Sequence, residues 1–261
     1  MENYKYYNDN NFVSSYRISK FVVDWMRERG DMRLPKLAEM MIKLDGKNAD
    51  PTDLANYKGV IPNPGATGDN NNTDMEDGSQ SRLKSKWYLE PVGPSAMNIG
   101  YPEQEFILAE AALRGWTEDD PETHYLNGIR AAHEFLGVSS ADTRAYLGHE
   151  KVQFKGSDTE KLGKIITEKY LNFFMQGGNE AYFELRRTGY PDFSAYLTHN
   201  TDQIYNDGYL PLRYRYPQSE IDNNNAQVSE AIKRLDKGDD RNSRMWLLQL
   251  SLIHLSEPTR H

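Results

Sequence analysis

The sequence contains no cysteine among its 261 residues. This absence excludes disulfide bonds, thiolate catalysis, cysteine-ligated zinc, iron–sulfur clusters and a lipidated cysteine within the chain. It does not identify the compartment, because a protein without thiols is compatible with oxidising and reducing surroundings alike.

Long apolar runs and an excess of positive charge are lacking too. No run approaches the roughly 18 apolar residues typical of a membrane-spanning helix, and residues 1–7 lack the basic and apolar stretches of an export signal. The 31 Lys and Arg residues are outnumbered by 39 Asp and Glu residues, which gives a formal net charge of -8. We therefore expect no nucleic-acid partner, because phosphate binding needs clustered positive charge.

Hydrophobic residues are scarce, at 38% of the chain with a mean hydropathy of -0.81. This predicts a modest core surrounded by long polar loops, although the length suffices for one large domain or two small ones. Tyrosine, in contrast, is abundant with 17 copies, a composition that favours recognition surfaces.

Apolar residues recur at intervals of three and four along much of the chain, which predicts a mainly helical protein. Proline in the first turn, serine or aspartate caps and glycine after the last turn mark the helix ends. We expect helices from Ser14 or Ser15 to Gly30, over residues 34–44 and 103–114, from Asp119 or Asp120 to Leu136, and over residues 158–175, 179–187 and 227–235.

Residues 46–101 differ in character from the rest of the chain. Closely spaced prolines and glycines divide them into pieces too short for helices, so we expect a loop-rich insertion with short β segments near residues 58–61 and 85–89. Residues 190–218 are also predicted to be irregular. Residues 250–261 resemble a translated sequencing adaptor and are treated as a non-native tail, which leaves residues 1–249 as the folding region.

Two of the predicted helices, those ending at Arg114 and Leu136, are joined by a connector of about five residues, so they form an antiparallel αα-hairpin. The hairpin has the size of one tetratricopeptide-like unit, although the sequence shows no clean internal repeat. The predicted fold class is therefore mainly α, with helical hairpins beside a loop-rich part that contains minor β structure.

The sequence contains no complete catalytic motif of the kinds considered. His133 and Glu134 start a zincin-like motif, but Gly137 stands where the second histidine is needed. The P-loop, dinucleotide-binding and nucleophile-elbow patterns do not occur. The acidic loop at residues 69–74 could ligate calcium through its oxygens, but it lacks the glycine and glutamate of an EF-hand. We expect a non-enzymatic protein without cofactor or metal, and leave calcium at this loop open.

Adjacent arginines, Arg186 and Arg187, end one predicted helix. Cations are favoured at a helix C-terminus, and one of the two can pair with a buried carboxylate such as Glu110 or Glu105. We favour this structural role over ligand binding.

Four aromatic residues that no helix stripe claims are the candidate ligand site: Trp87, Tyr88, Tyr57 and Tyr101. Flat aromatic faces beside amide and carboxylate groups suit polyhydroxylated ligands, since the ring covers C–H groups while polar side chains bond the hydroxyls. Trp87 and Tyr88 have an alternative role, in which they anchor the loop onto the helices. Trp116, which follows a helix stop, is expected to be a packing residue.

Several blocks together resemble SusD/RagB-like proteins. They comprise residues 31–36, which are similar to the family's D-P-R-L-P element with Met32 in place of its first proline, and residues 101–116, 125–129, 168–177, 184–191 and 211–220. The blocks follow one another in the family's order over residues 10–250.

The resemblance implies a surface-exposed outer-membrane lipoprotein of Bacteroidetes that binds glycans, or sometimes peptides. Such proteins cover a SusC-like TonB-dependent transporter and are built from tetratricopeptide-like hairpins with a loop-rich ligand part. Members are about twice this length and begin with a signal peptide and a lipidated cysteine. The resemblance therefore implies that this chain is the C-terminal half, and that its membrane association depends on a lipid anchor absent from it.

Two other functions remain open at this point. The hairpin at residues 103–136 could bind a protein partner, as helical-repeat adaptors do. A hydrolase would require carboxylates that come together only on folding.

Overall fold

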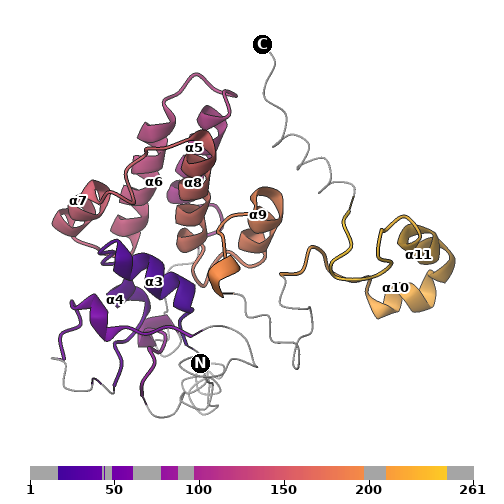
Figure 1. Ribbon diagram of the computed structural model, residues 1–261, viewed down its shortest axis with the longest axis horizontal. Coiled ribbons are helices and arrows are strands. Elements are labelled where there is room, and N and C mark those ends of the chain that lie inside the picture. The colour runs from indigo at the N-terminus through magenta and orange to yellow at the C-terminus, as the bar shows by residue number, and fades with distance from the viewer. Residues whose placement is uncertain are drawn as a thin grey trace.

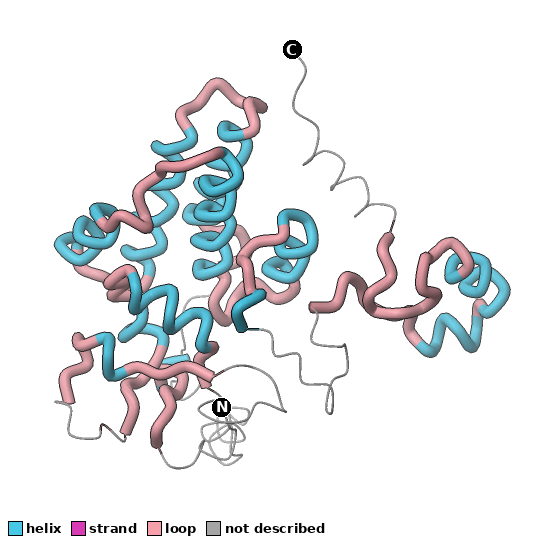
Figure 2. Tube along the Cα trace, in the orientation of Figure 1, coloured by secondary structure: helices cyan, strands magenta, loops and turns pink. Residues whose placement is uncertain are grey.

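The computed structural model describes residues 17–42, 44, 49–60, 78–87, 97–196 and 210–245. In these residues the protein is helical and contains isolated β-bridges but no strand (Figures 1 and 2). The α-helices are α3 (Lys20–Glu28), α4 (Leu34–Leu37), α5 (Tyr101–Leu113), α6 (Pro121–Phe135), α7 (Ser140–Gly148), α8 (Asp158–Asn172), α9 (Glu180–Thr188), α10 (Gln218–Asn223) and α11 (Asn225–Ile232). The predicted fold class, mainly α with tetratricopeptide-like hairpins, is confirmed.

The predicted hairpin is present, and α5 and α6 pack closely along their length (Figure 1). Pro102 lies in the first turn of α5, and the Asp120 side chain caps α6 by accepting from the backbone N–H groups of Glu122 and Thr123. The two helices approach closely because Gly128 has no side chain. A Cβ atom there would lie 2.6 Å from Cε1 of Phe106, whose ring is completely buried.

Two hydrophobic clusters form the core. The first gathers around α3 and α4 and includes Phe21, Val23, Leu34 and Leu83. The second lies between α5, α6, α7 and α8 and includes Phe106, Ile129, Tyr146 and Ile165.

Helix α8 belongs to both clusters. Its residues Leu162, Ile165 and Ile166 lie in the second cluster, whereas Leu171 near its C-terminus lies in the first. Ser157 begins α8 with a capping box, in which its hydroxyl accepts from the Glu160 N–H and its own N–H donates to the Glu160 carboxylate. The capping box thus fixes the start of the helix that joins the two hydrophobic clusters.

Four sequence predictions require correction. The helix expected over residues 34–44 ends at Leu37, because Ala38 leaves it for a β-bridge with Leu83. Residues 85–87 form a 3-10 turn rather than β structure, and the bridges lie earlier, at Arg82 and Leu83. Helices α7 and α10 were not predicted. The N-terminal helix begins at Lys20 after Ser19, while Ser14 and Ser15 lie outside the described residues.

Pro211 and Tyr214 bond Tyr182 and Asn179 at α9, whereas the two short helices that follow, α10 and α11, contact each other away from α9 and the α5–α8 bundle (Figure 1). Arg213 holds this segment together, since its buried guanidinium donates to Asp239 at 2.6 Å and to the Asp240 carbonyl at 3.2 Å. The expected helix over residues 227–235 lies slightly earlier, as α11.

The close approach of α5 and α6 predicts that Gly128→Ala destabilises the protein. The added methyl group must displace the Phe106 ring, and overpacking of this kind costs about 1–3 kcal/mol of the free energy of unfolding. Gly148→Ala in α7 is the matched control, because a Cβ there meets nothing within 4 Å and alanine favours helices by roughly 0.5–1 kcal/mol. Urea denaturation of both variants checks this, and equal stabilities would contradict the packing argument.

Candidate ligand-binding surface

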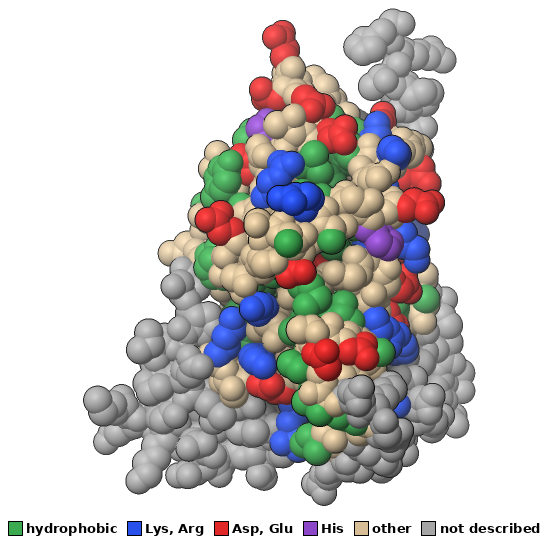
Figure 3. Space-filling view, turned by 90° about the vertical axis from the view of Figure 1, so that its left-hand side faces the viewer, with side chains coloured by type: hydrophobic (Ala, Val, Ile, Leu, Met, Phe, Trp, Pro, Cys, Tyr) green, Lys and Arg blue, Asp and Glu red, His purple; other side chains and the backbone are tan. Residues whose placement is uncertain are grey.

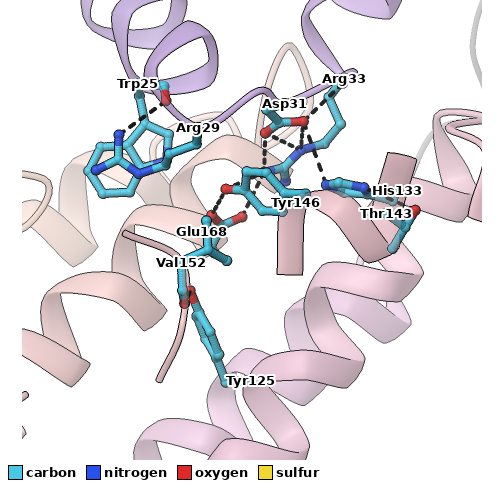
Figure 4. Close-up of polar contacts among 10 residues, drawn as sticks. All are labelled: Trp25, Arg29, Asp31, Arg33, Tyr125, His133, Thr143, Tyr146, Val152 and Glu168. Carbon is cyan, nitrogen blue, oxygen red and sulfur yellow. Dashed lines mark hydrogen bonds and ion pairs between the residues drawn. The ribbon is translucent and has the colours of Figure 1, made fainter. Parts of the chain in front are cut away.

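A buried charge cluster joins the segment after α3 to three other helices (Figure 4). The Arg33 guanidinium donates to both carboxylate oxygens of Asp31 through Nε and Nη2, at distances between 2.6 and 3.0 Å. Its Nη2 also donates to Glu168 Oε2 of α8 at 2.8 Å. All three side chains are at most 1% exposed. The carboxylates and the guanidinium pair with one another, so the cluster serves the scaffold, although Arg33 Nη1 is buried without a hydrogen-bond partner.

The same cluster includes residues from α6 and α7 (Figure 4). The Tyr146 hydroxyl donates to Glu168 Oε1, and His133 Nδ1 lies 3.2 Å from the Thr143 hydroxyl. Burial, together with the neighbouring Arg33 charge, lowers the pKa of His133 to about 3. His133 is therefore neutral at physiological pH, and the zincin-like start of its sequence has a structural role.

A second ionic network confirms the predicted arginine pairing. Arg187 of α9 makes a bidentate contact with Glu110 of α5 at 2.5 and 2.6 Å, and Arg114 donates to the same carboxylate at 2.7 Å. Burial alone would raise the pKa of Glu110, but the bonds from Arg187 and Arg114 outweigh it and lower the pKa. Glu105, the other carboxylate considered, pairs with His124 instead.

Trp87 anchors the loop-rich region onto the helices. Its ring packs against the first core and edge-on against Phe174, with the ring centroids 5.6 Å apart. The indole Nε1–H is buried and has no hydrogen-bond partner among the described residues. The alternative role given to Trp87 by the sequence, loop anchoring, is thus observed, and contact with a ligand stays a prediction.

A pocket adjoins Trp87. It measures about 280 Å³ with the open space at its mouth included, and Arg33, Asn172, Phe174 and Gln176 help to line it. Ligand pockets usually span roughly 300–1,000 Å³, so this one is too small to enclose an oligosaccharide. A ligand of that size would have to lie across an open surface.

Of the other three aromatic residues predicted for the ligand site, the structure describes two, and these differ in exposure. Tyr57 is only 1% exposed and donates its hydroxyl to the Pro51 carbonyl at 2.9 Å, so its expected exposure is wrong. Tyr101 is 57% exposed at the start of α5. Tyr88 and the acidic loop at residues 69–74 lie outside the described residues.

Trp116 does not pack as expected. It is 71% exposed after the end of α5, and the Arg114 guanidinium lies 5.5 Å from its ring centre. The positive φ of Gly115, 71°, turns the chain outward at this point.

The turn between α8 and α9 carries a feature that the sequence analysis missed. Three polar or aromatic side chains of this turn hold segments that are distant in the sequence: Phe174 contacts Trp87, Gln176 accepts from the Met97 N–H at 2.7 Å, and Asn179 accepts from the Tyr214 hydroxyl at 3.0 Å. The sequence predicted only a helix boundary here, between residues 175 and 179. No periodicity in the sequence indicates these long-range contacts.

Within the described ranges, no group of three or more His, Asp or Glu side chains is arranged to hold a metal ion. In the same residues, no helix combines the length and apolar character that crossing a membrane requires. On the face beside α7, acidic and basic side chains are interspersed, with hydrophobic ones scattered between them (Figure 3).

Comparison with protein families gives one match, to the family SusD-like_2, described as starch-binding and associating with the outer membrane, over residues 2–217. No curated protein matches the chain.

Solved structures also match this chain, over most of its length. Two SusD homologues from Bacteroides fragilis NCTC 9343 are 32% and 30% identical; they match 89% and 88% of this chain and 52% and 51% of their own lengths, with TM-scores of 0.79 and 0.74. A chitin-binding protein is 26% identical, with 88% of this chain and 49% of its own covered and a TM-score of 0.69. This chain thus spans about half the length of these relatives.

The buried cluster predicts a large effect of Glu168→Gln. The substitution keeps the shape of the side chain but removes one of the two carboxylate charges bonded to Arg33, and the loss of a hydrogen bond between charged groups costs about 1.5–3 kcal/mol. Glu134→Gln serves as the control, because Glu134 is exposed on α6. Guanidinium denaturation should show a much lower midpoint for Glu168→Gln alone, and similar midpoints would refute the scaffold role.

His133 predicts a loss of stability in acid. The unfolded chain takes up a proton on this residue near its ordinary pKa of 6.5, whereas the folded chain does so only near pH 3. The contribution of neutral His133 to the free energy of unfolding is therefore fully present above pH 6.5 and falls as the pH drops from 6.5 toward 3. Between pH 7.5 and 5 we expect a loss of roughly 2 kcal/mol, measured by urea denaturation. His133→Gln should flatten this dependence, and an unchanged slope would exclude His133 as its source.

Proposed function

Because the chain belongs to the SusD-like family, we propose that it binds an oligosaccharide at the bacterial cell surface and releases it uncleaved. The family match over residues 2–217 carries this proposal. Starch-binding is part of the family description, and one relative is a chitin-binding protein, so polymers of neutral sugars are the first ligands to consider.

We further propose that the bound glycan passes to a SusC-like TonB-dependent transporter in the outer membrane. A non-catalytic carrier needs an open surface from which an intact chain can leave. A polymer bound at Trp87 would extend beyond the small pocket there, which cannot enclose it.

Trp87 and Tyr101 are the ligand contacts we propose from the described residues, and Tyr88 remains a sequence-based candidate. Trp87 helps to line the small pocket described above. Tyr101 presents an exposed ring at the start of α5. Tyr57 takes no part, since its ring is buried.

The test is calorimetric titration of the chain with maltoheptaose and chitohexaose. We expect saturable binding without metal, and about fivefold weaker binding in Trp87→Ala and in Tyr101→Ala, because a lost aromatic contact of roughly 1 kcal/mol has this effect. Trp116→Ala is the control, since it removes an exposed ring at the other end of α5.

Circular dichroism must show that each variant is folded, because Trp87 also packs against the core. Binding that both aromatic variants retain in full would reject these contacts but not glycan binding. Shortened sugars in the reaction mixture, seen by chromatography, would contradict the non-catalytic function.

A further inference from the structure

Residues 212–241, which we call the arm, form a closed loop. The backbone N–H groups of Leu212 and Arg213 both donate to the Arg241 carbonyl, at 2.9 and 3.1 Å. The two ends of the arm therefore lie side by side, and α10 and α11 lie between them in the chain (Figure 1). Because these ends meet, the chain enters and leaves the arm at one place.

A buried ion pair reinforces this closure. Nη1 of Arg213 donates to Asp239 Oδ1 at 2.6 Å and to the Asp240 carbonyl at 3.2 Å, and the same Asp239 oxygen accepts from the Tyr216 N–H at 3.2 Å. The side chains of Arg213 and Asp239 are only 6% and 11% exposed. Since a buried charge is stable only beside its partner, these bonds keep the base of the arm closed and give the arm a shape of its own.

The arm shares no hydrophobic core with the α5–α8 bundle in the part of the chain that the structure describes. Neither hydrophobic cluster includes one of its residues. Within the described residues, Val228 is its one buried hydrophobic side chain, and α11, which carries Val228, packs on α10. Because burial of apolar surface is the main force that fixes one element on another, the arm is only weakly fixed to the bundle.

The arm meets the helices at α9. The Tyr182 hydroxyl donates to the Pro211 carbonyl at 2.8 Å, just before the arm begins. Within the arm, the Tyr214 hydroxyl donates to Asn179 Oδ1 at 3.0 Å, and its ring packs against Tyr182 with the centroids 5.3 Å apart. We call the contacts of Tyr214 with Asn179 and Tyr182 the latch.

The latch lies at the surface. Tyr214 is 60% exposed, so water can replace its hydrogen-bond partner when the contact breaks. Tyr182 does not depend on the latch, because the Arg186 guanidinium lies 5.3 Å from its ring centre and remains there on α9. Arg186 also contacts the chain beyond the arm, where its Nη2 lies 3.5 Å from the Met245 sulfur, a weak acceptor. These contacts can open without disturbing either hydrophobic cluster.

From this arrangement we propose that the arm is a hinged unit, which moves away from α9 as one body when the latch opens while the α5–α8 bundle stays folded. The hinge lies where the paired ends of the arm join α9. Opening uncovers the Tyr182 ring, and a molecule that contacts only one of the two positions would shift the balance between them. The proposal does not depend on the proposed function.

The absence of cysteine from the chain makes the test direct, since introduced thiols are the only ones that a spin label can modify. Glu122→Cys in α6 with Gln227→Cys in α11 reports the distance from the bundle to the arm. Glu122→Cys with Thr159→Cys in α8 is the matched control within the bundle. All three positions are exposed. Pulsed electron paramagnetic resonance on the full chain should give one narrow distance for the control pair and two distances for the arm pair.

Variants of the latch should change the balance between these two distances. Tyr214→Ala removes the ring contact and the hydrogen bond, and should raise the ratio of released to docked arm about tenfold. Tyr214→Phe keeps the ring and should raise it only about threefold. Arg215→Ala changes the exposed neighbour of Tyr214, outside the latch, and should leave the ratio as in the wild type.

Two results would overturn the hinge. The first is a single narrow arm distance that Tyr214→Ala leaves unchanged. The second is a broadening of the control pair together with the arm pair, because the arm and the bundle would then open as one cooperative unit.

Hydrogen exchange distinguishes movement of the arm from its unfolding. The amides of Leu212 and Arg213 bond the Arg241 carbonyl inside the arm, so they should stay protected in Tyr214→Ala. Loss of their protection in this variant would mean that the arm unfolds when the latch opens, and would overturn its movement as one body.

Discussion

The buried guanidinium of Arg33 is the constraint on which the rest of the structure depends. A charge that is 1% exposed is tolerated only with its partners in place, and these come from the adjacent Asp31 and from α8. Tyr146 of α7 then bonds the same Glu168, and His133 of α6 lies 3.6 Å from Asp31. One ion-paired side chain thus determines how the segment after α3 docks onto three helices. The D-M-R-L-P sequence carries this function, which explains why so polar an element lies in the interior.

Local signals in the sequence predicted much of this architecture. The Pro102 start and Gly115 stop of α5 and the Asp120 cap of α6 correspond to observed ends, because capping is decided by a few neighbouring residues. The helix expected over residues 34–44 failed for the opposite reason, since Ala38 pairs with a residue 45 positions away. Helix α7 has a Ser139 cap but buries only Tyr146, so its apolar stripe is too weak to detect.

The candidate site was less predictable than the scaffold. Exposure of an aromatic residue depends on tertiary contacts, and the exposure of Tyr57 and Trp116 was predicted wrongly: Tyr57 is buried in the first hydrophobic cluster, and Trp116 is exposed after a helix end. The pairing of Arg187 with a buried carboxylate could be predicted, because a buried charge is stable only beside an oppositely charged partner. The contacts of the α8–α9 turn could not, since hydrogen bonds such as that between Asn179 and Tyr214 leave no periodic pattern in the sequence.

Helix α8 has a consequence for how the protein loses its structure. Because its first turns belong to one hydrophobic cluster and Leu171 to the other, neither cluster can melt while the helix stays whole. The helix therefore imposes cooperativity on two cores that would otherwise open independently. Hydrogen exchange at the amides of Val23 and Ile129, far apart in the chain, should then proceed through the same global opening. Damage to either core is therefore shared by the whole scaffold.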